Sequence, residues 1–144
     1  MPALLVRPRD VSDGFLVLRD EEVHHLRVRR CQVGDAIEAI DGCGRFYRAR
    51  LEEVQRHEAR ALIVEVVEGW GESPVRLHLG VGLIKGQRLD FAVEKATEVG
   101  VASIAPMETR RAVARAGSEH RLDRWQRLAA AAAKQCGRSR VPQV

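Results

Sequence analysis

The sequence contains few cysteines, few aromatic residues and no long apolar run. Its three cysteines form no CxxC pair, which favours reduced thiols in a reducing compartment over a disulfide framework. His24, His25, Cys31 and Cys43 match the spacing of no zinc module, so we predict no metal site. The longest stretch without a charge, Val99–Met107, is far shorter than the roughly 20 residues that cross a bilayer. The N-terminus also lacks a secretory pattern, so we expect a cytoplasmic protein without membrane contact.

Charge is distributed unevenly along the 144 residues. Residues 1–72 carry eleven arginines and fourteen acidic residues, a net charge of −3, whereas residues 73–144 carry thirteen basic and six acidic residues, a net charge of +7. Residues 110–140 alone hold nine basic and two acidic side chains. A field of this sign suits a polyanion such as nucleic acid, and a solvated helix face is the alternative that charge alone leaves open.

The first seventy residues predict short strands around one helix. Asp41–Gly44 predicts a hairpin turn, because glycine adopts the positive φ that a tight reversal requires. Asp20 is placed to cap a helix over Glu21–Arg29. The expected strands are Ala3–Val6, Phe15–Leu18, Ala36–Asp41, Arg45–Val54 and Ala59–Val67. This pattern predicts a small β-barrel over residues 1–70.

Two glycines and a proline within residues 69–74 indicate a domain boundary. After it, two apolar segments flank a helical pattern, which predicts a strand–helix–strand unit with parallel strands, and a second helix follows. These elements are the strands Arg76–Ile84 and Val101–Met107 and the helices Arg88–Val99 and Glu119–Gln135. Parallel strands normally lie within larger sheets, so we expect residues 74–144 to be the incomplete first part of an α/β domain.

Two features of the second half are candidate binding or catalytic groups. Asp90, Glu94 and Glu98 recur every four residues, so they predict neighbouring cations, and general acid–base catalysis is the alternative. Lys85 follows the carboxyl end of an expected strand, the edge at which open α/β sheets bind ligands, and is a candidate anion contact.

The block QCGRSRVP, residues 135–142, is the most specific motif of the sequence. Gly137 is expected to end the preceding helix, which places Arg138 and Arg140 on a turn where their guanidinium groups can bind phosphates bidentately. Cys136 falls on the apolar stripe of that helix and has no paired histidine, so we interpret it as a packing residue rather than a nucleophile.

Together these motifs resemble the bacterial ribosomal RNA small-subunit methyltransferase E family over nearly the whole chain. The N-terminal PUA-like RNA-binding domain of that family resembles residues 21–54, EEVHHLRVRRCQVGDAIEAIDGCGRFYRARLEEV. The start of its catalytic domain resembles residues 83–113, LIKGQRLDFAVEKATEVGVASIAPMETRRAV, and residues 124–142, RWQRLAAAAAKQCGRSRVP. The resemblance implies a PUA-like β-barrel followed by the first part of a SPOUT α/β-knot methyltransferase domain.

The resemblance also implies a function. Such enzymes transfer a methyl group from S-adenosylmethionine to N3 of one uridine in small-subunit (16S) ribosomal RNA, acting on the assembled particle as homodimers. The glycine-rich knot loops that hold the cofactor would lie beyond residue 144, which implies no cofactor-binding residue in this chain and an inactive protein when it is alone. The alternative is a non-catalytic RNA-binding or ribosome-associated module.

Matching the family's blocks residue by residue gives candidate roles. Arg138 would be catalytic at the mouth of the active site, and the group that removes the N3 proton stays unassigned. The residues expected to contact RNA are Arg27, Arg30, Lys85, Arg110, Arg124, Arg127 and Arg140.

Overall fold

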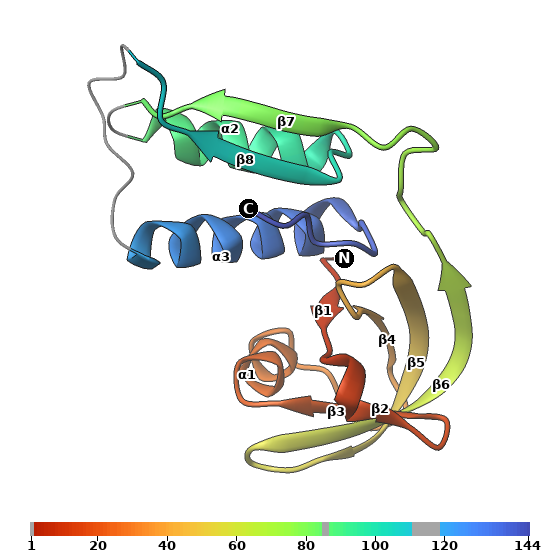
Figure 1. Ribbon diagram of the computed structural model, residues 1–144. Helices are drawn as coiled ribbons and strands as arrows, with labels where there is room; N and C mark the ends of the chain where they lie inside the picture. Colours follow the sequence, from red (N-terminus) through yellow and green to blue (C-terminus); the bar gives the residue numbers. More distant parts are fainter. Residues whose placement is uncertain (1, 85–86, 111–118) are drawn as a thin grey trace.

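The computed structural model describes residues 2–84, 87–110 and 119–144, which form two lobes joined by a linker (Figure 1). The barrel lobe comprises residues 2–68, the linker comprises residues 69–76, and the α/β lobe comprises the described residues within 77–84, 87–110 and 119–144. Helix α3 of the α/β lobe lies between the barrel lobe and the two-stranded sheet of its own lobe (Figure 1).

The barrel lobe is one curled six-stranded sheet with strand order β1-β4-β5-β6-β3-β2. Its elements are β1 (Leu4–Leu5), η1 (Pro8–Asp10), β2 (Val11–Ser12), β3 (Phe15–Arg19), α1 (Glu21–Val28), β4 (Ala36–Ile40), β5 (Arg45–Val54) and β6 (Glu58–Glu68). Only β1 and β4 pair in parallel within this sheet as described. The predicted barrel is confirmed, and the two-residue β2 is an addition that is too short to produce an alternating pattern.

Alternating side chains of these strands build the main core. Leu16 and Leu18 of β3 and Leu51 of β5 point inward and are almost fully buried. Helix α1 covers this core with Val23 and Leu26. Burial of each such aliphatic side chain contributes about 1.5–3 kcal/mol, which is why the polar–apolar alternation determines the fold here.

Asp41 organises the turn between β4 and β5. Its Oδ1 accepts the backbone N–H groups of Cys43, Gly44 and Arg45 at 2.8–3.0 Å, which confirms the predicted reversal. The predicted side-chain cap by Asp20 is wrong, since no cap hydrogen bond forms there. An N-cap needs an extended backbone to bring its side chain over the first turn, whereas Asp20 has a φ of 44°.

The α/β lobe is built from two strands and two helices. They are β7 (His78–Gly82), α2 (Arg88–Glu98), β8 (Ser103–Met107) and α3 (Glu119–Cys136). Strands β7 and β8 pair in parallel, as predicted. Leu89 and Val93 of α2, Ile104 of β8 and Trp125 of α3 form its core.

The end of α3 differs from the sequence-based expectation. Gly137 ends the helix with a φ of 78°, as predicted, but Cys136 is exposed and does not pack. The chain reverses at Gly137 and buries Arg138 and Ser139 instead, while the Cys136 thiol is exposed and lies 3.7 Å from the backbone carbonyl oxygen of Ala133. Gln143 then lies parallel to Ser103 and accepts the backbone N–H of Ile104 at 2.8 Å, which adds a short third segment beside β8.

The lobes meet through the C-terminal half of α3. Ala133 packs with Ala3, Ile40 and Phe46 in a small core of its own. Beside it, Lys134 Nζ pairs with Glu22 Oε1 of α1 at 2.5 Å, and both side chains are largely buried. The barrel therefore holds α3 by apolar packing and by a shielded ion pair. Within the described residues, no helix is long and apolar enough to cross a membrane.

Candidate nucleic-acid interface

Several hollows lie where the lobes meet, and two of them adjoin each other. A cleft of about 690 Å³ separates the N-terminal half of α3 from the turn between β4 and β5, and it is bordered by Arg127 and Asp123 on one side and by Cys43 on the other. A cavity of about 390 Å³ lies beside the linker. Gly42 and Val141 line both, so the two hollows are neighbours.

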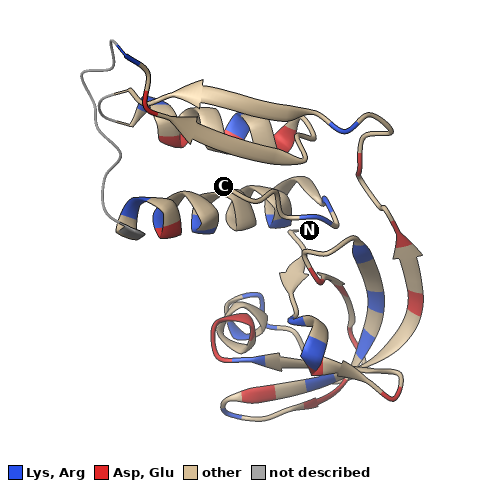
Figure 2. Ribbon diagram, viewed as in Figure 1, with Lys and Arg blue, Asp and Glu red and all other residues tan. Residues whose placement is uncertain are grey.

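Arg127 is the predicted RNA contact that borders the larger cleft. Its side chain is exposed, and its Nε donates at 3.3 Å to the backbone carbonyl of Asp123 one helical turn earlier. Among the described residues no carboxylate pairs with it, so its positive charge faces solvent. Figure 2 shows basic residues at intervals along α3, above a barrel in which basic and acidic residues are mixed.

Arg124 is oriented differently, although it lies on the same helix. Its Nη2 pairs with Asp90 Oδ2 of α2, and Asp90 Oδ1 accepts the indole N–H of Trp125 at 2.9 Å. One carboxylate therefore ties α2 to α3. The carboxylate of Asp90 thus partly neutralises the charge that Arg124 could offer to a phosphate.

The other two carboxylates predicted to need cations also have one. Lys95 Nζ lies 2.8 Å from Glu94 Oε1 and 2.8 Å from Glu98 Oε1. Hydrogen bonds to Glu94 and then Glu98 raise the pKa of Lys95 to about 12. With Asp90 paired to Arg124, the expected cations are confirmed for all three carboxylates.

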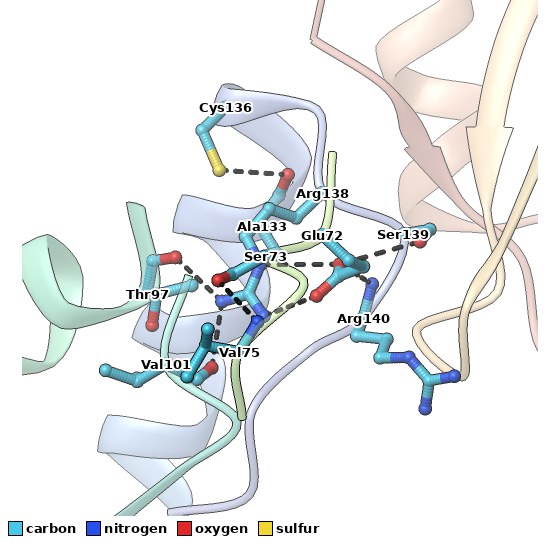
Figure 3. A network of polar contacts seen from close by, with 10 residues as sticks. All are labelled: Glu72, Ser73, Val75, Thr97, Val101, Ala133, Cys136, Arg138, Ser139 and Arg140. Atoms are coloured by element: carbon cyan, nitrogen blue, oxygen red, sulfur yellow. Dashed lines mark hydrogen bonds and ion pairs between the residues drawn. The ribbon is translucent and has the colours of Figure 1, made fainter. Parts of the chain in front are cut away.

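Arg138 does not lie on an exposed turn, which corrects the expectation that its guanidinium is open to phosphate. The residue is 2% exposed. Its Nη1 donates to the backbone carbonyls of Thr97 and Val101 at 2.8 and 3.0 Å, and its Nη2 lies 2.7 Å from Glu72 Oε2 (Figure 3). Each terminal nitrogen already has an acceptor. The geometry therefore assigns Arg138 to positioning the chain around it.

Glu72 of the linker is the centre of this network, and sequence reasoning did not identify it. Its Oε1 accepts the backbone N–H of Arg140 at 2.8 Å, while its Oε2 binds Arg138. Figure 3 shows the linker and the segment after α3 meeting at this carboxylate, while the end of α2 is joined to the network through the Arg138 guanidinium. A lone acid next to two glycines carries no periodic signal, so only the tertiary structure reveals its role.

Arg140 keeps the position that its motif predicts. Its side chain is exposed and leads away from the network (Figure 3). The guanidinium lies over Gly44, where a Cβ atom would come within 2.9 Å of Nη2. No carboxylate of the described chain pairs with it. Arg76 of the linker, also exposed and also without an acidic partner among the described residues, lines the same 390 Å³ cavity.

The remaining candidates lie elsewhere. Arg27 Nη2 donates to the backbone carbonyls of Gln55 and Arg56 at 3.0 and 2.8 Å and so ties α1 to the β5–β6 hairpin. Arg30 is exposed after α1, and Arg110 is exposed after β8. Neither hollow is lined by these three residues. Lys85 lies outside the described residues.

Sequence profiles of two known domain families match the chain. The profile described as an RNA methyltransferase domain matches residues 71–144, more than half of the chain. The profile described as an RNA methyltransferase PUA domain matches residues 18–64. The predicted order of a PUA-like barrel and a methyltransferase domain is therefore confirmed.

Curated relatives carry one name. The ribosomal RNA small subunit methyltransferase E of Synechocystis sp. is 32% identical over 142 residues, which span 98% of this chain and 46% of the relative. The protein of the same name from Bacillus subtilis is 30% identical over 86% of this chain and 50% of its own length. The chain thus spans about half the length of the curated relatives it matches.

Solved structures agree with this relationship. The ribosomal RNA small subunit methyltransferase E of Neisseria gonorrhoeae, bound to S-adenosylmethionine, superposes with a TM-score of 0.86 at 35% identity, over 99% of this chain and 59% of that one. A Legionella pneumophila methyltransferase with the same bound cofactor gives a TM-score of 0.80 at 28% identity, over 99% and 62% of the two chains. The chain therefore belongs to the RNA methyltransferase family that includes the ribosomal RNA small subunit methyltransferases E.

Proposed function

We propose that this chain supplies the RNA-binding lobe and the first part of the methyltransferase domain of an enzyme that methylates small-subunit ribosomal RNA with S-adenosylmethionine. One observation carries the proposal: Arg127 and Arg140, exposed and without carboxylate partners in the described chain, border adjoining hollows between the barrel and α3. Phosphates are the natural ligands of such guanidinium groups. The division into residues 1–70 and 74–144, a homodimeric whole enzyme and a cytoplasmic location belong to this proposal.

The finer proposal is that N3 of a uridine accepts the methyl group. N3 carries a proton and becomes nucleophilic only when that proton leaves, so a cation near the base would stabilise the anion that forms. The base must also be unpaired or flipped out of its helix. We assign Arg140 to the phosphates or base at this position, and Arg138 to holding the backbone of Arg140 through Glu72.

The proposal places no contact with S-adenosylmethionine among the described residues. Every buried side-chain nitrogen or oxygen among them already has a hydrogen-bond partner. In the 390 Å³ cavity, the carboxylate of Glu72 and the guanidinium of Arg138 are bound to each other. We therefore assign the cofactor contacts to the half of the family's fold that lies outside the match.

A chimera tests the proposal. Residues 2–144 would replace the matched half of the Synechocystis relative, and labelled S-adenosylmethionine would be supplied with unmodified small ribosomal subunits. We expect methyl transfer to the RNA, with 3-methyluridine identified by nucleoside mass spectrometry. The 144-residue chain alone is expected to bind RNA, to show no heat of binding with S-adenosylmethionine and to transfer no methyl group.

The test variant carries both Arg127→Ala and Arg140→Ala. The matched control is Arg45→Ala on the barrel surface, where the side chain pairs with Glu68. The test variant should weaken RNA binding by about ten-fold or more, and the control should change it little. RNA binding without methyl transfer by the folded chimera would favour a non-catalytic module, and methylation of another atom would refute the assignment to N3.

A further inference from the structure

Trp70 of the linker is held rigidly and is still 42% exposed. Its ring stacks on Phe46 of β5, with ring centres 5.1 Å apart and planes inclined by 25°. Gly69 and Gly71 on either side have φ values of 67° and 71°. The backbone carbonyl of Trp70 accepts the N–H of Ser139 at 2.9 Å, so the indole is fixed at the junction of the lobes.

Among the residues that the structure describes, no cation lies over the outer face of the Trp70 ring. The guanidinium carbon of Arg48 lies 5.5 Å from the centre of Trp70 and 5.8 Å from the centre of Phe46. The two ring centres are 5.1 Å apart. If the guanidinium of Arg48 lay over the outer face of Trp70, it would be about that much farther from Phe46 than from Trp70. The near-equal distances place Arg48 beside the stack, where Glu65 holds it at 2.5 Å.

A free cation lies close to this aromatic surface. Gly69 donates its backbone N–H to the carbonyl of Gly44 at 2.7 Å, and Gly44 is the residue that the Arg140 guanidinium covers. Trp70, which follows Gly69, and the guanidinium of Arg140, which covers Gly44, therefore lie on either side of the Gly69–Gly44 hydrogen bond. A flat aromatic face next to an unpaired guanidinium matches the two parts of a nucleotide, since the base stacks and the phosphate takes the charge.

We propose that the outer face of Trp70 is a stacking platform for one unpaired base of RNA, with Arg140 binding a neighbouring phosphate. This inference rests on the proposed function, because it takes RNA as the ligand. It adds a site in the linker, and it selects unpaired over double-stranded RNA, since paired bases do not present a free face. A Trp70 that merely covers Phe46 would make no such distinction.

The test uses the 144-residue chain with an unpaired RNA oligonucleotide of about 12 nucleotides and the duplex of the same sequence. Trp70 and Trp125 are the two tryptophans of the chain, and Trp125 is buried and hydrogen-bonded to Asp90. The emission of buried Trp125 is therefore a background, and the part of the fluorescence that a bound base can quench by contact comes from Trp70. The variant is Trp70→Leu, which keeps an apolar cover on Phe46, and the matched control is Phe91→Leu on the exposed surface of α2.

We expect the unpaired oligonucleotide to quench the fluorescence of the wild-type chain and the duplex to quench it much less. Trp70→Leu should bind the unpaired oligonucleotide about ten-fold more weakly with an unchanged salt dependence, because no phosphate contact is lost. Phe91→Leu should behave as the wild type. RNA binding without quenching, or with equal affinity for Trp70→Leu, overturns the platform alone, whereas a wild-type chain that binds no RNA overturns the proposed function with it.

Discussion

The sheet surface that carries Arg45 and Arg48 and the surface of α3 that carries Arg127 differ in how their arginines are paired. At one end of the β5–β6 pair, arginines bind carboxylates on the neighbouring strand, as Arg48 does with Glu65 at 2.5 Å and Arg45 with Glu68 at 3.0 Å. Arg127 on α3 has no such partner among the described residues. Exposed pairs of this kind add little stability, but they cancel the field that a polyanion would sense. The pairing of side chains therefore locates a binding surface more sharply than the net charge of either lobe.

The lobes also differ in the size of the apolar side chains that they leave exposed, which in the barrel are valines such as Val28 and Val64. The barrel closes its sheet around one core, with α1 over its side. The α/β lobe leaves Leu77, Phe91 and Met107 exposed around a sheet of two named strands. Between the lobes lies Arg138, a charged residue buried more deeply than any of these. We therefore expect mutations of ionisable residues at the surface, at the junction and in the barrel core to change stability and RNA binding by different amounts.

The largest effect is expected at the junction. Arg138→Met should lower the free energy of unfolding by about 3–5 kcal/mol, because it strands the Glu72 carboxylate in a largely buried position. The carbonyls of Thr97 and Val101 also lose their donor. Urea denaturation followed by circular dichroism measures the change.

Arg45→Met is the matched control, since it removes an exposed ion pair and should change the free energy of unfolding little. Equal losses for Arg138→Met and Arg45→Met would mean that the junction is not a distinct element of stability. The double variant Arg138→Met with Glu72→Gln should recover part of the loss, because the stranded charge is removed as well.

A smaller effect is expected in the barrel core, at Tyr47. Burial, and then the charge of Asp41, raise the pKa of Tyr47 above its ordinary value of 10.0. The folded state therefore holds the phenolic proton more tightly than the unfolded chain. Its contribution to stability is complete below pH 10 and is lost as the pH rises through the raised pKa.

Tyr47→Phe should remove this loss while costing about 1 kcal/mol or less near neutral pH, because the hydrogen bond to Asp41 is long, at 3.4 Å. The measurement is urea denaturation between about pH 8 and pH 11. Since Tyr47 is the only tyrosine, phenolate absorbance follows its titration directly. A titration at the ordinary value in the folded protein would contradict the assigned burial.

The sequence was most informative where structure is local. Alternation predicts β5 at its observed bounds, Arg45–Val54, because each inward side chain packs against the next strand. The fate of Arg138 was not predictable in this way, since its partner Glu72 is 66 residues away and no periodic pattern links them. The same limit applies to Cys136, whose exposure depends on where the chain turns after Gly137. Tertiary contacts decide which members of a basic cluster stay available to a ligand.

The smallest effect is expected when single arginines of α3 are replaced. These variants compare directly an arginine that has a carboxylate partner with one that has none among the described residues. Arg127→Ala should reduce the slope of log affinity against log salt by about 1, with a two- to three-fold loss of RNA affinity near physiological salt, because one phosphate contact and its released counterion are lost. Arg124→Ala should do less, since its charge is shared with Asp90. Arg45→Ala should leave the slope unchanged. Filter binding of RNA across a salt series measures all three, and equal slopes for Arg127→Ala and Arg45→Ala would show that pairing does not decide which arginines meet RNA.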